Sequence, residues 1–132
     1  MRPITFPYTP YKGRVAPIIP VELSGPRGWV QVWTYVDSGA TFSILGAESG
    51  ERLGLPIDHG KPSHIVVGDG SLIPVYIHRL PIRIGPVTFE AHIGTSPRLG
   101  VGFDLLGRQD IFTRFDVTFS DSRRIITFAP VS

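Results

Sequence analysis

Short runs of apolar and β-branched residues, bounded by glycine or proline, follow one another along most of the chain. Runs of this length that are rich in Val, Ile, Thr, Phe and Tyr predict strands rather than helices. The predicted strands are residues 18–23, 29–36, 64–67, 72–77, 80–84, 87–93, 115–119 and 125–128. Two windows, 47–53 and 108–112, predict short helices, and Gly54 marks the end of the first. The pattern therefore predicts an all-β protein with one or two short helices.

The N-terminal segment differs in character from the rest of the chain. Pro3, Pro7 and Pro10 remove backbone donors that a central strand needs. We therefore expect residues 1–17 to form a proline-rich extended arm over the surface, and residues 18–132 to form one folded domain. A chain of 132 residues can bury a sufficient core without disulfide or metal support.

Composition and charge exclude several classes of function. The chain has no cysteine, which excludes a disulfide, a cysteine-bound metal and a thiol nucleophile, and its four histidines lack the spacing of a metal motif. The net charge of +2 comes without a long basic run, which argues against nucleic acid as a partner. No apolar run is long enough to span a membrane, and the first residues lack a signal peptide. We therefore expect a cytoplasmic protein without membrane association, metal or other cofactor.

The segment with the strongest chemical signal begins at Asp37, directly after the predicted strand 29–36. The residues that follow are Ser38, Gly39, Ala40 and Thr41. A strand that runs into small residues presents the carboxylate on a rigid backbone, and the glycine lets another backbone approach closely. By itself, Asp-Ser-Gly is more often an ordinary turn capped by its aspartate.

A second signature lies further along the chain, where Leu105 and Leu106 lead into Gly107 and Arg108 and then into a predicted short helix. Between the two signatures lies a predicted hairpin tip formed by Val67, Gly68, Asp69, Gly70 and Ser71. Alone, this tip is an ordinary Asp-Gly hairpin loop. In this order, the three elements resemble the retropepsin-like (retroviral-type) aspartic proteases, in which an Asp-Ser/Thr-Gly-Ala turn, a glycine-bearing flap and an apolar-apolar-Gly segment follow one another.

The resemblance implies a closed β-barrel that acts as a homodimer on a peptide or protein substrate, without a cofactor. It makes Asp37 the catalytic carboxylate, Ser38 a hydrogen-bonding partner across the two-fold axis, and Gly39 a contact of the substrate backbone. Leu105, Leu106 and Gly107 would pack behind the turn, and residues 67–71 would close over the substrate. Because the chain has no second Asp-Ser/Thr-Gly, a monomer holds half a site, and the other aspartate would come from a second copy.

Some positions depart from the family pattern. Ala40 stands where pepsin-like members have a hydroxyl that stabilises the ionised carboxylate, so we expect a pH optimum nearer neutrality. Thr41 and Phe42 stand where retroviral enzymes often have an acidic residue. Because the N-terminus is a poor strand candidate, residues 125–128 are predicted to pair with their symmetry mate at the interface.

Other side chains receive structural interpretations. Arg108 is a candidate for an ion pair with Asp104 or Asp110, although solvated side chains are equally consistent with the sequence. A set of aromatic residues on one face of the predicted strand 29–36 is expected to pack in the core or an interface: Trp29, Trp33 and Tyr35.

Together these observations predict a homodimeric aspartic endopeptidase in which Asp37 activates a water molecule. The alternative is a catalytically inactive dimeric module of the same fold that binds peptides or serves as a scaffold, because a fold does not by itself establish an activity.

Overall fold

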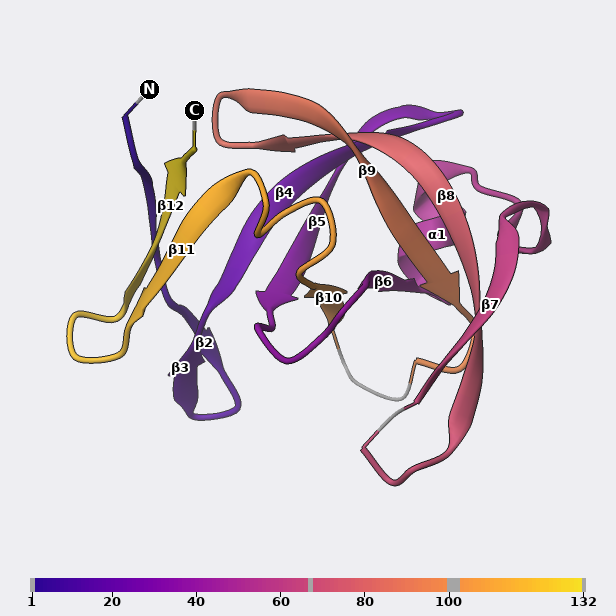
Figure 1. The fold of residues 1–132 in the computed structure, drawn as a ribbon, viewed down its shortest axis with the longest axis horizontal. Coiled ribbons are helices and arrows are strands. Elements are labelled where there is room, and N and C mark those ends of the chain that lie inside the picture. Colours follow the sequence, from indigo (N-terminus) through magenta and orange to yellow (C-terminus); the bar gives the residue numbers. More distant parts are fainter. Residues whose placement is uncertain (1, 67, 100–102, 132) are drawn as a thin grey trace.

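A computed structural model describes residues 2–66, 68–99 and 103–131 and shows a closed barrel of six strands (Figure 1). In order around the barrel these are β4 (Ile18–Gly25), β5 (Gly28–Val36), β10 (Asp104–Leu106), β6 (Ser43–Gly46), β9 (Val87–Ser96) and β8 (Leu72–Ile84). The ring closes where β4 pairs with β8, with Leu23 opposite Ile82. A further strand, β7 (Lys61–Val66), extends the sheet beyond β8. The expectation of an all-β barrel is therefore confirmed.

The two ends of the chain meet in a second, three-stranded sheet beside the barrel (Figure 1). Its central strand is β12 (Ile125–Pro130), flanked by β1 (Ile4–Pro7) and β11 (Phe115–Ser120). The N-terminal segment is thus a better strand than the sequence suggested, because Pro3 precedes β1 and Pro7 ends it. Since both edges of β12 are paired within the chain, the prediction that residues 125–128 pair with a symmetry mate is wrong.

The segment that follows β1 forms a small hairpin of β2 (Thr9–Tyr11) and β3 (Arg14–Ala16). Tyr8, between β1 and this hairpin, is buried and donates a hydrogen bond to Asp121. Burial, reinforced by Asp121, raises the pKa of Tyr8 to about 12. The N-terminal segment therefore consists of short strands that are anchored by strand pairing and side-chain contacts.

The core fills the barrel and extends to the three-stranded sheet. Large buried members of the core include Ile19, Leu23, Ile82, Ile93, Leu106, Phe115 and Phe128. Along β5 the predicted alternation is confirmed, because Val32 and Val36 are buried, whereas Trp29 and Trp33 are 40% and 50% exposed. Core packing of these two tryptophans is therefore not observed, and Trp29 instead lies against the guanidinium of Arg83.

The helices and the β8 region differ in part from the prediction. Helix α1 (Ala47–Leu53) is confirmed and ends at Gly54, which has φ of 78°. A single 3₁₀ turn, η1 (Ile57–His59), was not predicted. Predicted strands 72–77 and 80–84 form one strand, β8. The predicted strand 64–67 is part of β7, which ends at Val66, and Val67 lies outside the described residues. No helix of the described residues is long and apolar enough to cross a membrane.

The predicted helix 108–112 is a series of turns. Hydrogen bonds from Ile111 and Phe112 to the carbonyl of Arg108 begin a helical turn. Asp110 has φ of 65°, in the left-handed region, which interrupts a right-handed helix at that residue.

Candidate active site

Asp37 begins a tight turn at the end of β5, and backbone groups fix its position. Its N–H donates to the carbonyl of Leu106 at 2.9 Å, and its own carbonyl accepts from Ala40 N–H at 3.2 Å. The N–H of Gly39 donates to Asp37 Oδ1 at 2.8 Å. Within the described part of the chain, Oδ2 has no hydrogen-bond partner, so one oxygen of this half-buried carboxylate is held and the other is available.

Strand β10 lies directly behind this turn. It pairs in parallel with β5 and antiparallel with β6, so it separates the strand that enters the turn from the one that leaves it. Gly107 follows β10, and its N–H donates to the buried Ser43 Oγ at 3.0 Å. A Cβ at Gly107 would lie 2.4 Å from the carbonyl oxygen of Phe42 and 2.9 Å from that of Ala40. Only glycine fits this position, which explains the apolar-apolar-Gly signature structurally.

Arg108 joins the same assembly through main-chain contacts. Its N–H donates to the carbonyl of Ala40 at 2.9 Å, and its Nη1 donates to the carbonyl of Ser38 at 3.1 Å. Its guanidinium also lies over the ring of Phe112. The predicted ion pair with Asp104 or Asp110 does not form, because both carboxylates have other partners.

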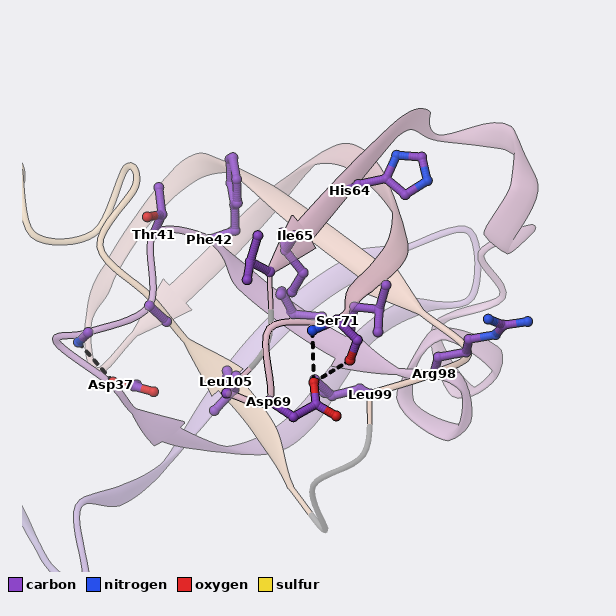
Figure 2. A pocket seen from close by; sticks show the side chains of 16 residues that line it. Asp37, Thr41, Phe42, His64, Ile65, Asp69, Ser71, Arg98, Leu99 and Leu105 are labelled. Carbon is purple, nitrogen blue, oxygen red and sulfur yellow. Dashed lines mark hydrogen bonds between the residues drawn. The ribbon is translucent and has the colours of Figure 1, made fainter.

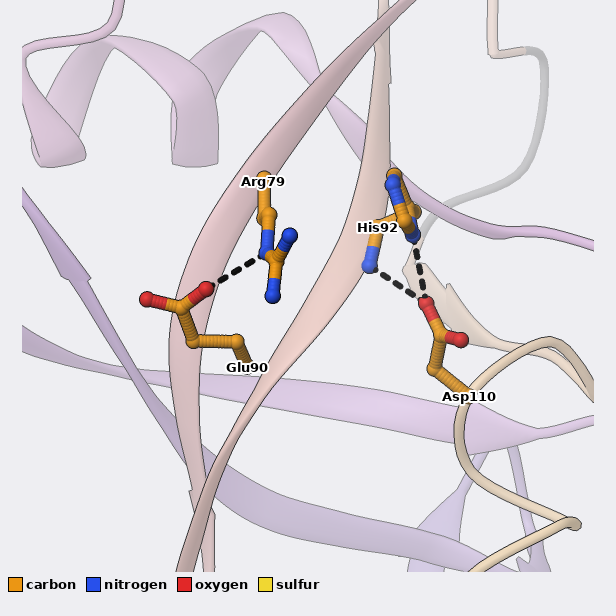
Figure 3. Close-up of polar contacts among 4 residues, drawn as sticks. All are labelled: Arg79, Glu90, His92 and Asp110. Atoms are coloured by element: carbon orange, nitrogen blue, oxygen red, sulfur yellow. Dashed lines mark hydrogen bonds and ion pairs between the residues drawn. The ribbon is translucent and has the colours of Figure 1, made fainter.

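The segment that supports the Asp37 turn is residues 104–110, and Asp104 and Asp110 hold its two ends in place. Asp104 is almost fully buried and accepts hydrogen bonds from Gly46 N–H and Ser49 Oγ. Burial raises the pKa of Asp104, although both hydrogen bonds oppose the shift. Asp110 Oδ2 lies 2.8 Å from both the backbone N and Nδ1 of His92 (Figure 3). Desolvation tends to raise the pKa of Asp110, but the hydrogen bonds and charge of His92 outweigh it and lower the pKa.

A cavity of about 880 Å³ opens in front of Asp37, between its turn and the β7–β8 hairpin (Figure 2). The predicted site residues that line it are Asp37, Gly39, Ala40, Thr41, Gly68, Asp69, Ser71 and Leu105. Apolar residues of the wall include Phe42, Ile44, Ile65, Ile73 and Leu99. The structure therefore places residues of all three sequence signatures around one cavity.

Of the other predicted residues, Val67 lies outside the described residues, and the rest are not part of the cavity wall. Ser38 is exposed at the turn, Leu106 and Gly107 are buried behind it, and Gly70 lies in the hairpin turn with φ of 85°. In the hairpin, Asp69 accepts hydrogen bonds from the backbone N–H and the hydroxyl of Ser71 (Figure 2). These bonds lower the pKa of Asp69.

Sequence reasoning missed Ser43 and His92 as parts of the supporting structure, and it assigned Asp104 to Arg108 rather than to Gly46 and Ser49. Their partners are distant in sequence, and no local motif marks the contacts. In residues 2–66, 68–99 and 103–131, no group of three or more His, Asp or Glu side chains could hold a metal ion. The site thus consists of one positioned carboxylate and an apolar cavity.

A family model described as aspartyl protease matches residues 19–104, which include the Asp37 turn and the β7–β8 hairpin. The chain belongs to the aspartyl protease family. The chain resembles the crystal structure of a retropepsin-like aspartic protease from Rickettsia conorii, with a TM-score of 0.69 and 17% identity over 96% of this chain and 98% of that one. It also resembles the EIAV protease complexed with the inhibitor HBY-793, with a TM-score of 0.56 and 16% identity over 76% and 88% of the two chains.

These structural likenesses establish a retropepsin-like fold for the chain. No curated protein sequence matches the chain. At this level of identity the likeness concerns the fold, and the activity has to be argued from the site itself.

Proposed function

We propose that this chain is a homodimeric endopeptidase in which each copy contributes Asp37 to one shared catalytic site. The observation that carries the proposal is the state of the Asp37 carboxylate. One oxygen is fixed by Gly39 N–H, the other has no partner among the described residues, and the group lines a largely apolar cavity. A carboxylate held in this way is positioned to bind a water molecule rather than to stabilise its own turn alone.

Two such carboxylates, facing each other across a two-fold axis, would divide the chemistry between them. Because two like charges so close together cannot both be ionised, one aspartate would be a carboxylate and the other a carboxylic acid. The ionised Asp37 takes a proton from a bound water as the water attacks the peptide carbonyl. The protonated copy donates its proton to the carbonyl oxygen. As the C–N bond of the tetrahedral intermediate breaks, the copy of Asp37 that took the water proton donates it to the leaving amine. The other copy recovers its proton from a hydroxyl of the intermediate, so a carboxylic acid product and an amine leave and no covalent enzyme intermediate forms.

The second carboxylate must come from another copy of the chain. Asp69, the other carboxylate that lines the cavity, is directed to Ser71 in its own turn (Figure 2). Ser38 is exposed beside Asp37, where it can bond across the axis to the partner's turn. In the three-stranded sheet, β1 and β11 are the outer strands, which makes their edges the candidates for pairing with a second copy.

The substrate would bind in an extended conformation between the Asp37 turn and the β7–β8 hairpin. Gly39 lines the cavity without a side chain, so a substrate backbone can approach it closely. The hairpin tip, residues 67–71, would act as the flap that covers the bound peptide and excludes water from the reacting amide.

Replacing Asp37 tests the proposal directly. Asp37→Asn keeps the shape of the side chain but removes the base, so cleavage of a mixed peptide library should fall by about a thousandfold or more. Melting temperature and oligomeric state should remain unchanged. Asp58→Asn, on the exposed η1 turn, removes the same charge and should retain full activity. Equal activity of wild type and Asp37→Asn would contradict the proposal.

A subunit-mixing experiment tests the shared site separately. If every active unit needs two Asp37 residues, adding an equal amount of the Asp37→Asn variant to wild type should reduce total activity to about half, because mixed dimers are inactive. Unchanged activity would show that one copy acts alone. If neither protein cleaves any peptide but both bind peptides equally, the chain is the peptide-binding module instead.

A further inference from the structure

The charged side chains around the cavity are few and unequal in their contacts. Asp37, Asp69 and Arg98 line it, together with the imidazole of His64. Asp37 is assigned to the chemistry, and Asp69 is engaged by Ser71. In Figure 2 Arg98 lies on the opposite side of the cavity from Asp37. Its guanidinium points away from Asp37, toward the outer edge of the cavity. A fixed positive charge therefore stands at the end of the cavity that is remote from the reacting carboxylate.

Arg98 differs from several arginines elsewhere on the barrel. Arg79 pairs with Glu90 (Figure 3), Arg83 contacts Glu22, and Arg108 donates to a backbone carbonyl. For the guanidinium of Arg98, no carboxylate or carbonyl partner occurs among the residues that the structure describes. A guanidinium at a cavity with all its donors available is suited to an incoming anion.

The backbone of Arg98 is nevertheless held in place. Its N–H donates to Ser96 Oγ at 3.2 Å, and the Ser96 hydroxyl donates to the carbonyl of Pro74 at 2.6 Å. Ser96 is buried at the end of β9, so the main chain at Arg98 is tied to both β9 and β8. The main chain at Arg98 is therefore held in place, whereas the N–H donors of its guanidinium are available to a ligand.

We infer that Arg98 binds a carboxylate of the peptide substrate and thereby sets a preference for an acidic group at a fixed distance from the scissile bond. This inference rests on the proposed protease function and adds a substrate class to it. The carboxylate would accept two parallel hydrogen bonds from the guanidinium. It belongs to an Asp or Glu side chain or to the carboxyl terminus of the peptide, since both present the same planar group.

The position of Arg98 determines where the acidic group is expected. Because Arg98 and Asp37 lie on opposite sides of the cavity, the favoured residue is separated from the scissile bond by at least one other residue. A two-fold axis through the catalytic pair would place one Arg98 at each end of the joint cleft. The preference should therefore occur at equal separations on both sides of the cleaved bond.

A cleavage-site profile tests the inference without a known substrate. A proteome-derived peptide library is digested with wild type, Arg98→Gln and Arg79→Gln, and the cleaved bonds are identified by mass spectrometry. For wild type we expect Asp and Glu to be enriched about fivefold at one position on either side of the bond, as for a partly exposed charge-assisted contact. Arg98→Gln should lose the enrichment. Arg79→Gln, which removes the same charge outside the cavity, should retain it.

Kinetics on matched peptides then identify the contact. Replacing the preferred Glu by Gln should raise KM about fivefold for wild type with little change in kcat, and the difference should shrink at high salt. Arg98→Glu should reverse the preference in favour of Lys at the same position. A library with amidated carboxyl termini separates the two sources, because a preference for the chain end disappears on amidation whereas one for a side chain persists.

The results also separate this inference from the proposed function. Cleavage by wild type without acidic enrichment, or enrichment that persists in Arg98→Gln, overturns the role of Arg98 and leaves the protease intact. If wild type cleaves no peptide, the proposed function fails. The role of Arg98 is then tested by measuring peptide binding with fluorescence anisotropy. Tighter binding of a Glu peptide than of its Gln counterpart, lost in Arg98→Gln, supports the role, and equal binding overturns it.

Discussion

The two walls of the cavity are built in opposite ways. The Asp37 turn lies against β10, and its main chain is hydrogen-bonded to Leu106 and, through Ala40, to Arg108. In the β7–β8 hairpin, residues 68–71 are exposed, and Asp69 and Ser71 are joined by local hydrogen bonds. One wall is therefore fixed by contacts between segments distant in sequence, and the other is shaped by its own turn.

The proposed hydrolysis would place different requirements on the two walls. A carboxylate that must hold a water molecule at a defined distance needs a backbone that does not move during the reaction. A segment that admits and releases a peptide needs low local stability, so that it can open without unfolding the barrel. The contrast predicts that equivalent substitutions in the two walls have very different costs.

The largest effect is expected for Gly107→Ala. The added Cβ would lie 2.4 Å and 2.6 Å from the carbonyl oxygen and carbon of Phe42, and neither backbone atom can move without displacing the Asp37 turn. We expect a loss of about 3 kcal/mol or more in the free energy of unfolding, together with loss of activity. Urea denaturation followed by circular dichroism measures the stability.

Gly68→Ala is the matched control in the hairpin. A Cβ at Gly68 has no heavy atom within 4 Å. Its effect on the free energy of unfolding should stay within about 0.5 kcal/mol. Equal destabilisation by the two alanine substitutions would remove the distinction between a rigid and a compliant wall.

A smaller effect is expected for Ser43→Ala. The Ser43 hydroxyl is buried and accepts the N–H of Gly107, which is left without a partner when the hydroxyl is removed. An unsatisfied buried donor costs about 1 to 3 kcal/mol, which thermal unfolding should detect. Ser71→Ala also removes a serine hydroxyl, but from the exposed hairpin tip, and should leave the unfolding temperature almost unchanged. A larger effect of Ser71→Ala than of Ser43→Ala would reverse the comparison.

Local sequence pattern predicted those parts of the fold that depend on neighbouring residues. Alternation along β5, the stop at Gly54 and the glycine turns follow from the backbone preferences of a few consecutive residues. The order of the three signatures was sufficient to predict the barrel family, and the structure places all three around the cavity. Each of these features is determined by residues that lie close together in the sequence.

The features that sequence did not reveal depend on contacts between distant residues. The pairing of β1 with β12 was missed because the prolines near β1 suggested a poor strand, although they lie at its ends. The bonds of Gly107 to Ser43 and of Asp110 to His92 join residues in different strands and loops. No pattern within a single segment records such contacts. Arg98 likewise gained its interpretation only from its place in the cavity.

The smallest expected effect concerns the pH dependence of the stability that Asp110 contributes behind the Asp37 turn. The pKa of Asp110 is lowered in the folded protein, so the folded state binds fewer protons near the ordinary value of 3.8. Its contribution to stability is therefore present above that value and is lost as the pH falls through the lowered pKa. Between about pH 6 and about pH 3, wild type should lose more stability than Asp110→Asn, by less than about 1 kcal/mol. Urea denaturation at several pH values measures the difference.

His92 provides the internal test of this assignment. In a His92→Ala background, Asp110 loses its contact with Nδ1, so replacing Asp110 by Asn should change the pH dependence less than it does in wild type. Asp116→Asn, at an exposed position of β11, removes the same charge from a residue that is not part of this contact and serves as the control. If the pH dependence of Asp110→Asn equals that of wild type, the bond to His92 does not stabilise the supporting segment. The rigidity of the wall that carries Asp37 would then have to come from the other contacts of this segment, those of Asp104, Gly107 and Arg108.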